Sequence, residues 1–203
     1  MNDLHKALGD IGRIRRQMAR TTEFRGYGPA TLAATAAFAV LAASAQAFWV
    51  ADPANHTGAY LGIWIWTAFV SAALIGVQMH SRTRRIHSAL ADEMIRMAVE
   101  QFLPSVAAGF LLTLILARFV PSLLWMLPGL WQIIFSLGVF SSCRFLPRPM
   151  LAAGAWYLLC GLFCIAVGDA RAFSPWAMGI PFAGGQLLVA AILFFTNGAR
   201  DET

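Results

Sequence analysis

Two cysteines lie one helical turn apart in an apolar stretch toward the C-terminal end of the chain. Cys160 and Cys164 would place two thiols on one face of a helix, and thiolates are good ligands for soft metal ions. No histidine or carboxylate stands at a spacing that would complete such a site. Buried, unreactive thiols are therefore the favoured interpretation, and we expect neither a metal nor another cofactor.

Glutamines are the strongest polar side chains within the apolar segments. Gln132 and Gln186 are the deeper two, and amides in such positions usually form hydrogen bonds between helices. If both faced one cavity, they could instead bind a small polar solute. Pro181, Gly184 and Gly185 precede Gln186 and interrupt the last apolar segment. A kink that only relieves packing is the favoured interpretation, and a broken helix that lines a site, as in many transporters, is the alternative.

The usual catalytic groupings are missing from the sequence. The four histidines, His5, His56, His80 and His87, fall outside the apolar segments or at their ends, which disfavours a haem held between two histidines. There is no glycine-rich phosphate loop, no serine–histidine–aspartate grouping in a plausible layout and no pair of carboxylates within an apolar segment. The mid-membrane carboxylate of ion-coupled pumps is also missing. We therefore expect a protein that is not an enzyme.

The elements that carry these residues are long apolar helices. Of the 203 residues, 59% are hydrophobic and 12% are charged, whereas soluble domains carry about twice that charged fraction. Six apolar segments each have close to the 20 or so residues that a helix needs to cross a bilayer. They cover residues 30–50, 61–79, 103–120, 122–142, 150–168 and 176–196. The sequence thus predicts an all-α, polytopic membrane bundle of six transmembrane helices over residues 29–197, between an N-terminal segment, 1–28, and a short tail, 198–203.

The third and fourth segments need a boundary, because the apolar sequence between them is almost continuous. A turn at Pro128 and Gly129 would leave about 13 residues for the fourth span, which is too few to cross a bilayer. A turn at residues 118–122 gives two adequate spans and places Pro121 at the surface. We predict the turn there, with Pro128 kinking the fourth helix near its start.

Positive charges lie almost entirely on one side of this topology. Of the 15 lysines and arginines, 13 fall in the N-terminal segment, the second and fourth connections and the tail, and only Arg118 and Arg171 fall on the other side. Since basic loops stay in the cytoplasm, we expect both termini to be cytoplasmic, in a bacterial inner membrane. Tyr60, Trp125 and Trp176 near the predicted external boundary fit that orientation, because such rings favour the headgroup layer.

Two polar segments on the basic side form the predicted cytoplasmic surface. Residues 1–28 contain an amphipathic helix, since apolar residues recur every three or four positions from Leu4 to Met18. The loop at 80–101 repeats that pattern and is expected to extend the second or third span as a helix. The residues that we expect at this interaction surface are Ile14, Arg15, Arg16, Met18, Arg20, Phe24, Arg82, Arg84 and Arg85.

Anionic lipid headgroups are the favoured partner of this surface, because basic side chains on amphipathic helices reach lipid phosphates. A second copy, giving a homodimer, and a cytoplasmic protein partner are alternatives. Nucleic acid is not expected, since basic residues in a membrane protein usually report orientation. The leading hypothesis is a membrane scaffold or regulatory protein. A carrier or channel lined by Gln132 and Gln186 is the alternative, and a membrane enzyme or cofactor-binding subunit ranks third.

A juxtamembrane motif resembles a family of bacterial six-span membrane proteins. The motif is Ile14-Arg15-Arg16-Gln17-Met18-Ala19-Arg20-Thr21-Thr22-Glu23-Phe24. Members of the family begin with a short helix of the form Ile-Arg-x-x-Met-x-Arg-Ser/Thr-Ser/Thr-x-Phe and continue into an apolar span; here threonines stand where serines are expected. A second similarity is the turn Arg144-Phe145-Leu146-Pro147 before an aromatic-rich span. The family has no assigned activity, so the resemblance implies a layout and points to the juxtamembrane segment.

Overall fold

The computed structural model describes residues 28–86, 89–143 and 149–201, and nearly all of them are helical. The helices are α2 (Pro29–Trp49), α3 (Thr57–Ile86), α4 (Ala89–Phe119), α5 (Leu127–Ser142), α6 (Met150–Val167) and α7 (Pro175–Asp201), with 3-10 helices η1 (Pro121–Met126) and η2 (Asp169–Phe173). Within the described residues, six spans are long and apolar enough to cross a membrane, and η1 and α5 together form the fourth. The predicted all-α polytopic bundle is confirmed. The amphipathic helix predicted within residues 1–28 falls on residues 1–27, which lie outside the described residues.

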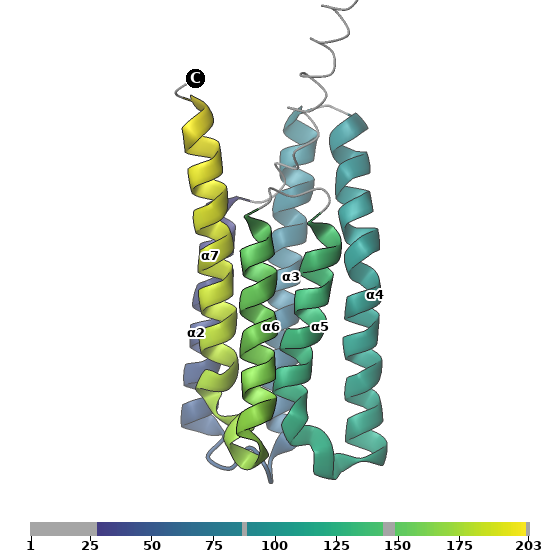
Figure 1. Cartoon of the computed structure of the whole chain (residues 1–203), viewed down its shortest axis with the longest axis vertical. Coiled ribbons are helices and arrows are strands. Elements are labelled where there is room, and N and C mark those ends of the chain that lie inside the picture. The colour runs from purple at the N-terminus through teal and green to yellow at the C-terminus, as the bar shows by residue number, and fades with distance from the viewer. Residues whose placement is uncertain (1–27, 87–88, 144–148, 202–203) are drawn as a thin grey trace, which may run out of the picture.

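The helices form a ring in chain order (Figure 1). Each packs beside the next, and α2 also packs along most of α7, which closes the ring. The contact between α3 and α4 is the weakest between successive spans. The end of α3, the start of α4 and the end of α7 lie at one end of the bundle, while η1, η2 and the α2–α3 connection lie at the other (Figure 1). We call these the α3–α4 end and the η end.

Prolines mark where the helices begin. Pro29 and Pro128 stand in the first turns of α2 and α5, and Pro175 opens α7. A proline is tolerated there because N–H groups in the first turn of a helix have no hydrogen-bond partner within the helix, so the N–H that proline lacks is not needed. The third span ends at Phe119, inside the predicted turn. Pro128 does not kink an α-helix, because the chain before it is the 3-10 turn η1 and the α-helix starts only at Leu127.

Glycines bring α5 and α6 into backbone contact. A Cβ added to Gly161 would lie 2.7 Å from the carbonyl oxygen of Gly129, and Gly154 holds the ring of Phe140 against its backbone. Small residues allow such close approach of helices within membranes. Gly168, seven residues after Gly161, has a different role. It has a φ of 69° and ends α6 instead of packing against a helix.

The α3 and α4 spans are the least covered by the rest of the chain. Only 11% of the residues in the apolar stretch of each of these two spans are buried, whereas 33–39% are buried in the other four spans. Their outward faces carry exposed apolar side chains such as Trp66, Phe69 and Phe110, as expected for surfaces in contact with lipid. Tyr60 does not lie at the external headgroup boundary where it was predicted. It is fully buried and packs edge-on against Phe173, so it belongs to the core and not to the headgroup layer.

Candidate functional site

The predicted interaction surface falls partly on the α3–α4 end. Arg82, Arg84 and Arg85 stand on the last turns of α3, beyond the apolar span that ends at Ser81. On the other side of the connection, α4 begins at Ala89, ten residues before its span starts at Val99. Apart from residues 87 and 88, which lie outside the described residues, the 80–101 segment extends both spans as helix, as predicted. The other predicted surface residues, Ile14, Arg15, Arg16, Met18, Arg20 and Phe24, lie outside the described residues.

Gln132 has a structural partner in the bundle. Its Nε2 donates to the carbonyl oxygen of Ala177 at 2.9 Å and lies 3.7 Å from the sulfur of Met178. That carbonyl needs an outside donor because Pro181, four residues later in α7, has no N–H to offer it. The amide of α5 thus completes the hydrogen bonding of α7. Its Oε1 has no hydrogen-bond partner within the described part of the chain.

Helix α7, which forms the sixth span, is not broken. It runs continuously through Pro181, Gly184 and Gly185, so the alternative of a broken helix is wrong. The carbonyl of Pro181 itself accepts a hydrogen bond of 2.9 Å from the indole of Trp156. The glycines make room for α6, because a Cβ on either would meet the ring of Trp156 or of Tyr157. Partners from α5 and α6 therefore allow the helix to continue.

The two glutamines do not share a site. Gln186 is half-buried beside Tyr157, whereas Gln132 is fully buried at the level of Met178. Eight residues of α7 separate these levels, or about 12 Å along a helix axis. Neither Gln132 nor Gln186 lines either of two hollows found in the described part of the chain, one at the η end and one on α3.

Gln46 forms a second buried link, which holds η2 in place. Its Nε2 donates to the carbonyl of Phe173 at 2.7 Å, and the indole of Trp64 donates to its Oε1 at 2.7 Å. Through these two hydrogen bonds Gln46, on α2, links α3 and η2. Sequence reasoning predicts hydrogen bonds between helices for such glutamines, but it does not identify these partners, because the link joins residues up to 127 positions apart.

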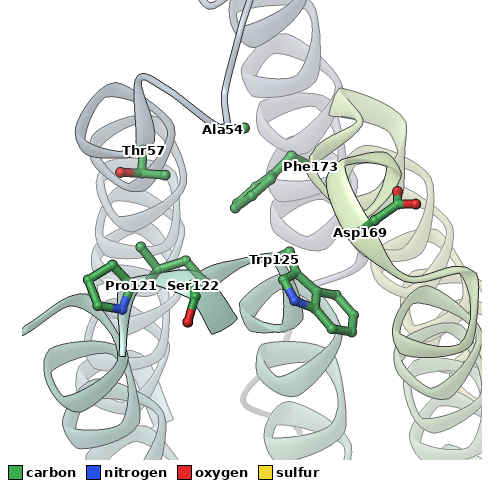
Figure 2. A pocket seen from close by; sticks show the side chains of 8 residues that line it. Ala54, Thr57, Pro121, Ser122, Trp125, Asp169 and Phe173 are labelled. Carbon is green, nitrogen blue, oxygen red and sulfur yellow. The ribbon is translucent and has the colours of Figure 1, made fainter. Parts of the chain in front are cut away.

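A hollow of about 450 Å³ opens at the η end (Figure 2). Its lining comes from the α2–α3 connection, the start of α3, η1 and η2: Ala54, Thr57, Pro121, Ser122, Leu124, Trp125, Asp169 and Phe173. Figure 2 shows the Phe173 ring reaching into the hollow, with Trp125 and Asp169 on the same side of it. The hollow thus combines aromatic faces, hydroxyl groups and a carboxylate. The sequence offered little sign of it beyond an acidic residue directly after Gly168.

Asp169 stands at the rim with its carboxylate turned to solvent. Its Oδ1 accepts a hydrogen bond of 3.0 Å from the backbone N–H of Arg171, and the Arg171 Nε lies 3.4 Å away. These contacts, the backbone hydrogen bond first, lower the pKa of Asp169 below its ordinary value of 3.8. The carboxylate is therefore ionised at neutral pH. The backbone of Asp169 has a φ of 50°, in the left-handed region, which aspartate and asparagine adopt more readily than most residues.

The cysteines of the described residues do not form a metal site or a disulfide. Cys143, Cys160 and Cys164 are free, and Cys164 is buried. Among the described residues, no three histidine, cysteine, aspartate or glutamate side chains gather where they could hold a metal ion. Comparison of the chain with protein-family models, curated proteins and solved structures found no match.

Proposed function

We propose that this multi-pass membrane protein is a non-enzymatic scaffold or regulatory protein that presents a basic cytoplasmic surface. The observation that carries the proposal is the continuation of α3 and α4 as helices past their apolar spans. This arrangement places positions 82, 84 and 85 on helix α3, beyond the end of its apolar span.

The charge distribution supports a cytoplasmic position for this end. Thirteen of the 15 basic residues fall on the side that includes the α3–α4 connection and both termini. In a bacterial inner membrane such a bias places that side in the cytoplasm. Arg118 and Arg171 then belong to the external side, at the η end.

The polar groups inside the spans support a scaffold more than a carrier. Gln46 and Gln132 each donate to a backbone carbonyl of another element. Gln186 lies about 12 Å from the level of Gln132, so the two amides do not converge on one solute. These side chains hold the bundle together, which favours function at its ends.

Anionic lipid headgroups are the partner that we propose for the basic end. Each lysine or arginine near an anionic surface contributes about 1 kcal/mol to binding. A second copy of the chain and a cytoplasmic protein remain the alternatives, and the same arginines would take part in either.

Lipid retention tests this proposal. We would release the protein from nanodiscs containing phosphatidylglycerol and phosphatidylethanolamine and count retained lipids by native mass spectrometry. Replacing Arg82, Arg84 and Arg85 together by glutamine should reduce retained phosphatidylglycerol at least threefold, and Arg15, Arg16 and Arg20 replaced together should act in the same direction. Arg118→Gln, at the η end, is the matched control and should change nothing. Equal retention in the wild type and both triple variants would argue for a protein partner in place of lipid.

A further inference from the structure

The hollow at the η end has the chemistry of a cation site. Two aromatic side chains, Trp125 and Phe173, contribute to its lining, and Asp169 is the one carboxylate among its eight lining residues. Its volume of about 450 Å³ lies within the range of small-molecule sites in proteins. No lysine, arginine or histidine lines it. The only charged side chain among the eight lining residues is therefore negative, which disfavours an anion, although Arg171 pairs with that carboxylate from outside the lining.

Aromatic faces and a carboxylate together select organic ammonium groups. The face of an aromatic ring, and of tryptophan most strongly, attracts a cation within about 6 Å of its centre. A carboxylate adds direct charge attraction. Inorganic cations are strongly hydrated and prefer several oxygen ligands, whereas an alkylammonium group tolerates contact with rings. The lining offers two rings and one carboxylate, which fits the alkylammonium group better.

We propose that the hollow at the η end binds an organic ammonium group, of the choline or ethanolamine type, against the rings of Trp125 and Phe173, with the Asp169 carboxylate at its rim. Figure 2 shows Trp125 and Asp169 on the same side of the hollow. The ammonium group can come from a free solute or from the headgroup of a zwitterionic lipid, because the η end is one end of the membrane spans.

The site is held in place by buried contacts. Phe173 packs edge-on against the fully buried Tyr60, with ring centres 5.1 Å apart, and its carbonyl accepts the hydrogen bond from Gln46. The wall of the hollow is thereby fixed to α2 and α3. A ligand that enters does not need to order this wall, so less binding energy is lost to conformational entropy.

Arg171 competes for the carboxylate. Its Nε lies 3.4 Å from Asp169 Oδ1, and the two side chains are 72% and 68% exposed. An ion pair this exposed is weak because water screens it. The same guanidinium also donates to the carbonyl of Val167 at 3.0 Å. Arg171→Gln should therefore strengthen ammonium binding about twofold to threefold.

Choline binding to the full-length protein tests the free-solute source. The protein would be placed in nanodiscs of phosphatidylglycerol, which has no ammonium group, and titrated with choline by saturation-transfer difference NMR. The neutral isostere 3,3-dimethylbutan-1-ol separates charge from shape and should bind at least threefold more weakly.

Two variants remove the proposed contacts. Asp169→Asn removes the charge but keeps a residue that suits the left-handed backbone, and Trp125→Leu removes the ring. Each should weaken binding about threefold to tenfold, with Trp125→Phe between wild type and Trp125→Leu. Asp52→Asn and Trp49→Leu are the matched controls. They change the same residue types on α2 or the connection after it, outside the lining, and should leave binding unchanged.

The lipid source is tested by native mass spectrometry from nanodiscs that contain phosphatidylethanolamine. Retained phosphatidylethanolamine that falls in Asp169→Asn, without binding of free choline, would assign the site to a lipid headgroup. Saturable choline binding that falls in the same variant would assign it to a free solute. The proposal is overturned if neither ligand responds to Asp169→Asn and Trp125→Leu, or if the neutral isostere binds as tightly as choline.

Discussion

Gln132 and Pro181 form a coupled pair whose energies a double-mutant cycle can separate. Pro181 leaves the carbonyl of Ala177 without its helical donor, and Gln132 Nε2 supplies the missing hydrogen bond at 2.9 Å. The glutamine side chain is fully buried, so water cannot replace it. The Gln132 amide therefore satisfies a carbonyl that only the presence of Pro181 leaves without a donor.

The change Gln132→Met removes the donor while keeping a side chain of similar length. A buried acceptor left without a partner costs about 1–3 kcal/mol. Removing Oε1, which has no partner within the described part of the chain, offsets some of this cost. We expect Gln132→Met to lower the free energy of unfolding by about 1–2 kcal/mol.

Pro181→Ala supplies the missing half of the cycle. With an N–H at position 181, the carbonyl of Ala177 regains the ordinary donor four residues along the helix. In that background Gln132→Met should cost about 0.5 kcal/mol or less. The coupling energy between the two positions should then be about 1 kcal/mol.

Equilibrium unfolding of the four proteins in mixed micelles, followed by far-ultraviolet circular dichroism, gives the cycle. Gln46→Met is the control, since Gln46 bonds to the carbonyl of Phe173 and shares no partner with Pro181. Its cost should be the same with and without the proline. If Gln132→Met cost as much in Pro181→Ala as in the wild type, the assignment of Gln132 to the freed carbonyl would be refuted.

Two further predictions concern packing and orientation. Gly161→Ala should lower the unfolding temperature, because the added Cβ would lie 2.7 Å from the carbonyl of Gly129, whereas Gly62→Ala has no atom within 4 Å and should be neutral or stabilising. Equal shifts for both alanines would mean that the α5–α6 contact is looser than the structure has it. A fluorescent-protein fusion after residue 203 should fluoresce, because the C-terminus is predicted to be cytoplasmic. An alkaline phosphatase fusion within the connection after Trp49 should be active, because that connection is predicted to be external. The opposite pattern of reporters would invert the proposed topology.

Much of the fold was predictable because the bilayer restricts it. Backbone groups in hydrocarbon must bond within their own segment, so an apolar run of sufficient length has to be a helix. The boundary before Pro121 and the helical extension of the 80–101 loop followed from span length and periodicity, and the structure has both. The alternative of a helix broken at Pro181 was wrong, and Gln132 supplies a donor to the carbonyl that the proline leaves free.

The candidate sites were less predictable than the spans. Gln132 and Gln186 look equivalent in the sequence, yet one bonds to α7 and the other lies about 12 Å along that helix. The hollow at the η end draws on four segments spread from Ala54 to Phe173. No local pattern connects Trp125 with Asp169, because their closeness depends on how η1 and η2 meet.

The sequence by itself determined the class of protein, the number of spans and the concentration of positive charge on one side. These are properties of composition and length, on which the energy of transfer into lipid depends directly. Only the tertiary structure decided that α2 closes the ring against α7, that Tyr60 points inward and that Gln132 serves Pro181. The physical reason is that lipid and apolar side chains attract a helix almost equally, so close packing and a few buried hydrogen bonds choose its neighbours.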